Sequence, residues 1–243
     1  TAVTVGQAIQ LKTNNSLIIR QLISDNVIEV LGVDMDIPQE SYDPDYPMML
    51  SKDEISALLD AMLILANGEE NTLVEDIQTD VTVGQAKQFK GNASHIIKQL
   101  LSDAIIDAIG VDDIPLEAYI DEDPSNRLTD EEIDAMIDAI GILGEDHELV
   151  SAISTQVTVG QAVEFKDTPS LIIQQLLSDA IIDAIDPNDE GKIPLDAYID
   201  GDSNNRLTID EINHMIDALV ILANNDLNTL VEDISTDLTV GQL

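Results

Sequence analysis

The sequence contains no cysteine and no tryptophan, and it has only two phenylalanines and four tyrosines among its 243 residues. Without cysteine there are no disulfides and no thiolate metal ligands, which excludes thiol redox chemistry. The shortage of aromatic rings removes the stacking platforms on which proteins bind sugars or single-stranded nucleic acids. Basic residues are also scarce, at 10 against 48 acidic ones. The resulting net charge of −38 repels nucleic acid and anionic lipid, so neither is an expected partner.

Long apolar runs are missing as well. No stretch approaches the roughly 20 apolar residues that span a bilayer, so we expect no membrane insertion. Thr1–Gln10 lacks the basic start and apolar stretch of a signal peptide, which suggests a mature or excised segment. Hydrophobic residues nevertheless make up 44% of the chain, enough to bury a core despite the charge.

One four-residue motif, Thr-Val-Gly-Gln, occurs four times, beginning at Thr4, Thr82, Thr158 and Thr239. The separations of 78, 76 and 81 residues indicate a tandem array. We divide the chain into sequence repeats 3–80, 81–156 and 157–237, with net charges of −12, −12 and −14. Residues 238–243 resemble the start of a further repeat or a capping stub, and we expect the natural protein to continue with more copies.

Each sequence repeat is predicted to contain about four helices, which makes the fold class mainly α. The first helix begins with a Thr-x-x-Gln capping box, Thr82 to Gln85, and ends near Lys90. Gly84 weakens this helix, so a short strand through Val81–Val83 is the alternative at the start of each repeat. The second helix, Ser94 to Ile109, carries a broad apolar stripe at helical spacing. Ser16 and Ser170 open the equivalent helices in the other repeats.

The third and fourth helices follow an acidic segment. Thr129 to Leu143 is predicted as the third helix, opened by a second capping box from Thr129 and Glu132. The pairs Ser51 with Glu54 and Thr208 with Glu211 repeat this arrangement. Glu148 to Ile153 is predicted as a short fourth helix, matched by residues 71–77 and 228–234.

Twelve residues, Asp121–Glu132, precede the third helix and carry the most distinctive chemistry. Their counterparts are Asp43–Glu54 and Asp200–Glu211. Calcium prefers six to eight oxygen ligands, and a twelve-residue loop supplies them from positions one, three, five, seven through its carbonyl, nine and twelve. The spacing therefore resembles the EF-hand loop and implies bound Ca2+. A loop followed by one helix, without a full incoming helix, resembles the half EF-hand of dockerin modules, which implies a partner-binding role. Dockerins are shorter and keep a glycine at position six.

The predicted calcium ligands share these loop positions. In the second repeat they are Asp121, Asp123, Ser125, Arg127, Thr129 and Glu132. In the third repeat they are Asp200, Asp202, Asn204, Arg206, Thr208 and Glu211. A weaker first site consists of Asp43, Asp45, Met49, Ser51 and Glu54. Apolar Leu128 and Leu207 at position eight are predicted to point into the core.

Two details separate the first loop from the others. Position five is Pro47, which offers no side-chain oxygen. Position six, where an EF-hand has glycine for a sharp turn, is Met48 in the first loop but Asn126 and Asn205 in the others. Asparagine tolerates the left-handed backbone conformation, whereas methionine does not. We therefore predict two strong calcium sites per chain and a weak or absent third.

Helix capping by itself is the alternative explanation of these loops, because Ser, Thr and Asp collect before helices. Capping explains positions nine and twelve, but it leaves the Asp-x-Asp at positions one and three unexplained. A second acidic cluster precedes each loop, at Asp34 and Asp36, at Asp112 and Asp113, and at Asp186–Ile193. The last resembles the first eight positions of another EF-hand loop, although Ala197 stands where the closing glutamate belongs, so it is at best an incomplete or shared site.

No catalytic centre emerges from the sequence. The three histidines, His95, His147 and His214, lie in different elements and none recurs in another repeat. Carboxylate pairs alone lack the aromatic walls of a glycosidase cleft, and Val-Gly-Gln lacks the further glycines and lysine of a phosphate loop. We therefore do not expect an enzyme.

The leading interpretation is a calcium-binding structural or adhesive segment of an extracellular or cell-surface protein, rigidified by calcium. Its partners would be neighbouring repeats, copies of itself or another surface protein. An intracellular calcium buffer or calcium-responsive contractile or scaffold protein is the alternative, and an acidic surface domain from a salt-loving organism is a third. If calcium is the ligand, replacing Glu132 or Glu211 with glutamine should abolish one site each and lower thermal stability only when calcium is present.

Overall fold

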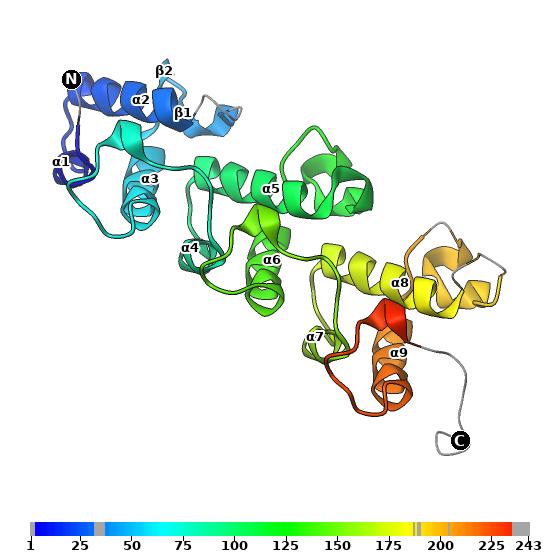
Figure 1. The fold of residues 1–243 in the computed structure, drawn as a ribbon. Helices are drawn as coiled ribbons and strands as arrows, with labels where there is room; N and C mark the ends of the chain where they lie inside the picture. The colour runs from blue at the N-terminus through cyan, green and yellow to red at the C-terminus, as the bar shows by residue number, and fades with distance from the viewer. Residues whose placement is uncertain (1–2, 32–36, 187, 189–190, 204, 235–243) are drawn as a thin grey trace. The chain divides into compact units, whose positions relative to one another are not determined.

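The computed structural model describes residues 3–31, 37–186, 188, 191–203 and 205–234, and it confirms a mainly helical chain (Figure 1). These residues contain nine α-helices, single turns of 3-10 helix and one small antiparallel sheet of β1 and β2. The helices are α1 (Val5–Leu11), α2 (Leu17–Leu31), α3 (Lys52–Leu65), α4 (Val83–Phe89), α5 (His95–Ile109), α6 (Asp130–Leu143), α7 (Val159–Glu164), α8 (Leu171–Ile185) and α9 (Ile209–Leu222). Within the described segments, none of them is long and apolar enough to cross a bilayer.

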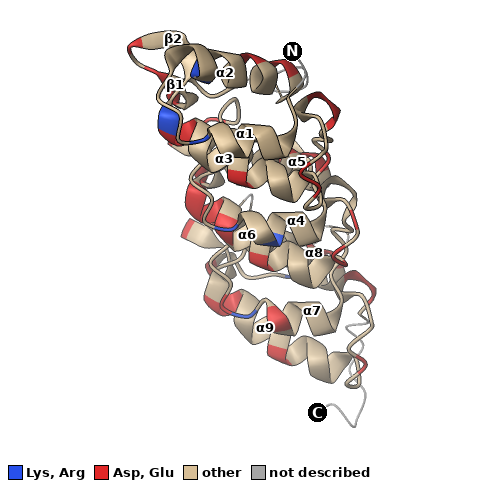
Figure 2. Ribbon diagram, turned by 90° about the vertical axis from the view of Figure 1, so that its left-hand side faces the viewer, with Lys and Arg blue, Asp and Glu red and all other residues tan. Residues whose placement is uncertain are grey.

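The chain divides into two compact units. One comprises the residues up to Asp107 together with Asp146–Ser151, and the other comprises Ala108–Glu145 and the residues from Ala152 onward. The boundary falls inside α5, so these units do not coincide with the three sequence repeats, and the three-repeat division stays a prediction. Acidic residues recur on loops and helix ends in each unit, whereas Lys and Arg are few (Figure 2).

The short helices α1, α4 and α7 begin at the predicted capping boxes. Thr82 Oγ1 accepts a hydrogen bond from the Gln85 N–H at 3.3 Å, and Gln85 Oε1 accepts one from the Thr82 N–H at 3.0 Å. The equivalent pairs form the same box at α1 and α7. Helix α4 ends at Phe89, as predicted. The alternative strand is reduced to an isolated β-bridge between Thr82 and Leu149.

The glycine of each short helix lies against another backbone segment. The Gly160 N–H donates to the Leu227 carbonyl at 2.8 Å, and the Gly84 N–H donates to the Asp146 carbonyl at 2.9 Å. A Cβ added to Gly160 would lie 3.0 Å from that carbonyl oxygen, and one added to Gly84 would lie 2.9 Å from its own partner. Glycine is therefore required at these positions because another backbone segment approaches closely, although glycine has a low helix propensity.

We expect Gly160→Ala to lower the free energy of unfolding by about 1–2 kcal/mol. Alanine favours an isolated helix by about 1 kcal/mol, but here the new methyl group would push the Leu227 backbone away and weaken its hydrogen bond. Urea unfolding followed by circular dichroism measures the change. Gly84→Ala should act in the same direction. A higher urea midpoint of unfolding in both variants would contradict the claim that the backbone contact requires glycine.

The second helix of each repeat forms over the predicted segment and buries the predicted stripe. In α5 the buried apolar side chains, each at most 8% exposed, are Ile96, Ile97, Leu100, Leu101, Ile105 and Ile109. Ala104 and Ala108 are half-buried. Helix α8 buries its stripe in the same way, whereas α2 begins with exposed side chains, Leu17 at 45% and Ile18 at 80%.

The third helices, α3, α6 and α9, begin at the predicted caps, but the predicted second capping box is wrong. Thr129 Oγ1 accepts the Glu132 N–H at 3.2 Å, yet the Glu132 carboxylate does not return to the Thr129 N–H. That N–H donates instead to the Ala118 carbonyl at 2.9 Å. Ser51 and Thr208 show the same pattern, with carbonyl partners at 2.8 and 2.9 Å. The cap backbone is thus satisfied, and the glutamates are available for other partners.

The predicted fourth helix is only a single 3-10 turn, at Val74–Asp76, Val150–Ala152 and Val231–Asp233. The Val150 N–H donates to the Val81 carbonyl at 2.8 Å, which ties the turn to the segment that precedes α4. The turn does not continue as a helix because the backbone is extended again directly after it, at Ile77 and at Ile234. Val150 itself is fully buried and fixes the turn to the core.

Candidate functional site

The second and third acidic loops share one backbone arrangement. The Ile120 N–H donates to the Arg127 carbonyl at 3.0 Å, and an isolated bridge joins Tyr119 to Leu128. Asn126 Nδ2 donates to the Ile120 carbonyl at 3.2 Å. The third loop repeats all three contacts, through the Ile199 N–H, the bridge from Tyr198 to Leu207, and Asn205 Nδ2.

The leucine at position eight points inward, as predicted. Leu128 is fully buried and Leu207 is 1% exposed. The Leu207 N–H donates to the hydroxyl of Ser178 at 2.8 Å, and the Leu50 N–H donates to Ser24 at 3.0 Å. These two serines, in α2 and α8, are fully buried, so each hydroxyl ties its loop to the core.

The sharp turn of the second loop is not where an EF-hand comparison places it. Its left-handed residues are Asp121 and Glu122, both at φ 55°, at loop positions one and two and not at Asn126. In the third loop the corresponding residues are Asp200 at φ 55° and Gly201 at φ 67°. The Asn126 side chain instead holds the start of the loop through its hydrogen bond to the Ile120 carbonyl.

The predicted oxygen ligands of the second loop are exposed or engaged within the loop. Asp123 Oδ1 accepts from the Ser125 N–H at 3.0 Å and from the Ser125 hydroxyl at 2.8 Å. These hydrogen bonds lower the pKa of Asp123 below its ordinary value, because they favour the charged form. Asp121 is exposed and Thr129 Oγ1 caps α6. Of the third loop, Asn204 lies outside the described residues.

The glutamate at position twelve has a different set of partners. Glu132 is 4% exposed, and its Oε1 accepts from the Ser170 hydroxyl at 2.5 Å and from the Ile172 N–H at 3.2 Å. Its Oε2 accepts from the Leu171 N–H at 3.0 Å. The carboxylate therefore caps the N-terminus of α8, where unpaired N–H groups and the helix dipole favour negative charge.

Glu54 makes the same contact at the N-terminus of α5. It is 3% exposed, and it accepts from the Ser94 hydroxyl at 2.5 Å and from the His95 and Ile96 N–H groups at 3.1 and 3.2 Å. The His95 ring adds Nδ1 at 3.1 Å from Oε2. We call the contact between a buried glutamate and the N-terminus of the following long helix the glutamate contact. Glu54 makes it in one unit and Glu132 makes it in the other.

A glutamine reinforces the glutamate contact. Gln161 Nε2 donates to the Ile142 carbonyl near the end of α6 at 3.2 Å, while its Oε1 stays in the capping box of α7. Gln85 Nε2 likewise donates to the Ile64 carbonyl near the end of α3 at 3.3 Å. Each glutamine thus connects a short helix to the helix that carries the buried glutamate.

Sequence reasoning missed the glutamate contact, although its signal was present. A serine that opens an apolar helix follows the position-twelve glutamate by 40 residues in one case and by 38 in the other. Helix capping and calcium binding each explained the position-twelve glutamate from its neighbours in sequence, so no distant partner was sought. Glu211 occupies the same loop position but is half-exposed, and among the described residues its carboxylate has no partner.

The first loop is built differently, as a hairpin of β1 (Tyr42–Asp43) and β2 (Tyr46–Leu50). Arg20 donates to Asp43 Oδ2 at 2.8 Å and to the Leu50 carbonyl at 3.0 Å. The guanidinium hydrogen bond lowers the pKa of Asp43, because it favours the charged form. Met48 is 79% exposed and Met49 is buried. The Arg20 guanidinium thus already pairs with the first predicted ligand of this loop. The weak first site stays a prediction.

The second acidic clusters do not form a common site among the described residues. Asp112 and Asp113 lie in an exposed 3-10 turn. Asp186 Oδ2 accepts from the Lys192 N–H at 2.8 Å and so closes its own loop. Asp34 and Asp36 lie outside the described residues. No group of three or more His, Asp or Glu side chains in the described part gathers closely enough to hold a metal, but calcium loops also use carbonyl and hydroxyl oxygens. Calcium binding stays a prediction.

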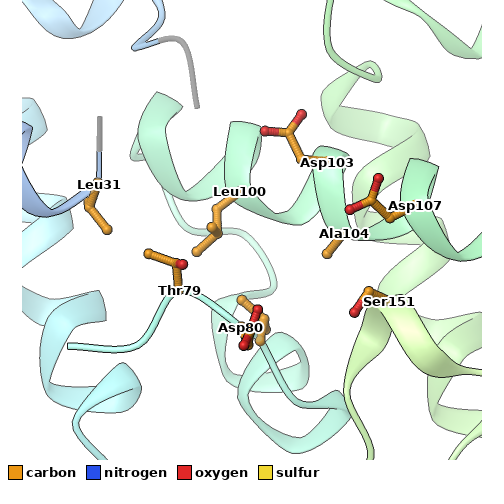
Figure 3. A pocket seen from close by; sticks show the side chains of 9 residues that line it. Leu31, Thr79, Asp80, Leu100, Asp103, Ala104, Asp107 and Ser151 are labelled. Atoms are coloured by element: carbon orange, nitrogen blue, oxygen red, sulfur yellow. The ribbon is translucent and has the colours of Figure 1, made fainter. Parts of the chain in front are cut away.

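A pocket of about 140 Å³ lies in the first unit (Figure 3). Its lining residues are Leu31, Thr79, Asp80, Val81, Leu100, Asp103, Ala104, Asp107 and Ser151. Asp103 and Asp107 lie one turn apart on α5, and Asp80 comes from the segment before α4. The lining contains three carboxylates and no histidine, lysine or arginine. A carboxylate is therefore the only side chain of the lining that could act as a general base toward the hydroxyls of Thr79 and Ser151.

Comparison with known proteins identifies no relative of this chain. No protein-family model, no curated protein and no solved structure matches it.

Proposed function

We propose that this chain is a calcium-binding structural segment of a larger extracellular or cell-surface protein, built from tandem helical repeats and without catalytic activity. The glutamate contact is the observation that carries the structural part of the proposal. It occurs at Glu54 and again at Glu132, and each time it joins the third helix of one sequence repeat to the second helix of the next. A link of this kind suits an array whose repeats hold only their neighbours.

The chemistry of the glutamate contact favours a stiff connection. A buried carboxylate is costly unless donors replace its lost water, and Glu132 receives one hydroxyl and two backbone N–H groups. Ile172 is fully buried beside it, as Ile96 is beside Glu54. Bending between the joined helices would expose both the charge and the apolar side chain to water, which resists the motion.

The calcium part of the proposal assigns the ion to the exposed rim of the loops. Asp121, Asp123, Ser125 and the Arg127 carbonyl in the second loop remain the proposed ligands, with Asp200 and Asp202 in the third. Because Glu132 is held in the glutamate contact, the second loop would have fewer charged ligands than a full EF-hand loop. Fewer charges lower affinity, and sites with dissociation constants of about 10⁻⁴–10⁻³ M fit extracellular modules.

Isothermal calorimetry tests the calcium proposal. We expect about two sites per chain, and at calcium tenfold above the dissociation constant each site should add about 1.4 kcal/mol to the free energy of unfolding. The double variant Asp121→Asn with Asp200→Asn should abolish the calorimetric signal. The variant Asp76→Asn with Asp196→Asn, which removes two exposed charges outside the loops, should retain it.

Sodium chloride at matched ionic strength is the second control, because it screens charge without occupying a specific site. Equal stabilisation by sodium and calcium, together with no calorimetric signal, would contradict calcium sites. That outcome would leave the glutamate contact unaffected, since protein hydroxyl and N–H groups hold both carboxylates.

A further inference from the structure

A second pocket, of about 240 Å³, lies in the unit that contains α6 and α7. Helix α6 forms one side of it, and the end of α7 with the connection to α8, residues 164–169, forms the other. The lining residues are Ala135, Asp138, Ala139, Ile142, Glu164, Phe165, Lys166, Asp167, Thr168 and Pro169. All of them belong to the same compact unit, so the pocket is a feature of that unit alone.

Most of the lining is apolar. Ala135, Ala139 and Ile142 recur at helical spacing along α6, so they form one stripe that faces the connection. Phe165, which is 3% exposed, and Pro169 add apolar surface from the other side. Such a surface makes favourable contact with methylene groups, whereas a small hydrated ion gains nothing from it.

The connection that forms the second side is fixed by polar contacts to α9. Lys166 Nζ donates to both carboxylate oxygens of Asp217 at 2.8 Å, so the one cation of the lining is already paired. The Asp167 N–H donates to Asn213 Oδ1 at 3.1 Å, and Asn213 Nδ2 donates back to Asp167 Oδ1 at 2.7 Å. The pocket is therefore formed before any ligand binds, which lowers the entropy cost of binding.

Carboxylates surround the apolar surface. Asp138, Glu164 and Asp167 all contribute to the lining, and all three residues are exposed. Glu164 is the last residue of α7, and within the described segments it has neither a hydrogen bond nor an ion pair to its side chain. The entrance of the pocket thus favours a positive charge, while its interior favours methylene groups.

The equivalent connection, between α4 and α5, has a different charge. Phe89 recurs there in place of Phe165, but Gln88 stands where Glu164 is and Gly91 where Asp167 is. Gly91 and Asp167 share a left-handed backbone, with φ of 71° and 61°. The two connections therefore follow a similar path, and the acidic entrance belongs to the α7–α8 connection and not to every repeat.

We propose that this pocket, which we call the lysine pocket, binds a lysine side chain of a basic partner protein. Lysine has a stem of four methylene groups, the longest among the cationic side chains, and these would lie on the apolar stripe of α6. Its ammonium group would reach Glu164 at the entrance. The inference names the chemistry of a partner for the structural segment proposed above, and it rests on that proposal only in expecting a protein partner.

A titration of the isotopically labelled full chain with N-acetyl-lysine methylamide, followed by nuclear magnetic resonance, tests the proposal. The buffer is chelator-treated and contains about 0.15 M sodium chloride, which screens exposed charges beyond roughly 8 Å. We expect saturable shifts at the amides of Ala135, Ala139 and Phe165. N-acetyl-norleucine methylamide, which has the stem but lacks the ammonium group, should bind at least threefold more weakly.

Three variants separate the lysine pocket from attraction by net charge. Glu164→Gln should weaken binding of the lysine probe about threefold, as expected for one exposed ion pair. Glu75→Gln removes an exposed charge in the other unit and should leave binding unchanged. Ala135→Leu fills the pocket at constant charge and should abolish the saturable shifts. The helix tolerates a large side chain there, since His214 occupies the equivalent position of α9, and circular dichroism checks that the variant is folded.

Several results would overturn the proposal. Equal weakening by Glu164→Gln and Glu75→Gln would mean that net charge alone attracts the probe. Equal binding of the norleucine probe, binding that survives Ala135→Leu in a folded chain, or an absence of saturable shifts in the lining would also exclude a lysine pocket. None of these results affects the calcium titration or the glutamate contact, so the proposed function is tested separately.

Discussion

Replacing Glu132 with glutamine is expected to lower the free energy of unfolding by about 3 kcal/mol with no calcium present. The side chain is 4% exposed, and its two oxygens accept from Ser170, Leu171 and Ile172. Glutamine keeps one acceptor, but its amide NH2 would face an N–H or hydroxyl donor at the start of α8. At least one buried donor is then unpaired, and the favourable interaction of charge with the helix dipole is lost.

Glu211→Gln is the matched control for this prediction. Glu211 occupies the same loop position after the same cap, but its carboxylate has no partner among the described residues. Its substitution should change the free energy of unfolding by no more than about 0.5 kcal/mol. Urea unfolding of both variants in chelator-treated buffer measures the difference. Equal effects, or a Glu132 effect seen only with calcium, would show that the carboxylate acts through the loop and not through α8.

Ile172→Ala is the second substitution with a large expected effect. Ile172 is fully buried at the first turn of α8, directly beside the glutamate contact, so its truncation loses apolar burial and leaves a cavity. We expect a loss of about 2–5 kcal/mol in the free energy of unfolding. Thermal and urea unfolding monitored by circular dichroism provide the measurement.

Ile18→Ala provides the control at the equivalent position of α2. Ile18 is 80% exposed, so the same truncation removes little buried surface and should cost less than about 0.5 kcal/mol in dilute, monomeric protein. The contrast isolates tertiary burial, because the local sequence and the helix position are alike. A similar loss in both variants would mean that helix propensity, and not packing, sets the cost.

Most of the helices were predictable, because helices depend on signals within a few residues. The capping box of Thr82 with Gln85 and the apolar stripe of α5 both lie inside the element that they define, and both are confirmed. The second capping box is absent because a distant backbone group intervened, since the Thr129 N–H donates to the Ala118 carbonyl. The fourth helix is a single turn because the backbone is extended again directly after it, at Ile77 and at Ile234.

The candidate site also combines features that the sequence predicted with features that it did not. Leu128 and Leu207 point inward as the loop pattern predicted. The hairpin of the first loop was not predicted, because Pro47 and Met48 were interpreted only for their effect on calcium binding. The partners of Glu54 and Glu132 were missed, because they follow about 40 residues later and only the similar spacing of the two pairs, not a local rule, connects them. The hydrogen bond from Arg20 to Asp43 is a second contact of this kind, because 23 residues separate the two.

The sequence by itself determined that this protein is acidic and mainly helical, since composition, periodicity and caps act over short distances. Only the tertiary structure decided what the position-twelve glutamates do. Glu54, Glu132 and Glu211 stand in closely similar local settings, yet two are buried beneath a helix N-terminus and one is half-exposed. A carboxylate takes the partner that replaces its lost water, and whether such a partner is present depends on how distant segments pack.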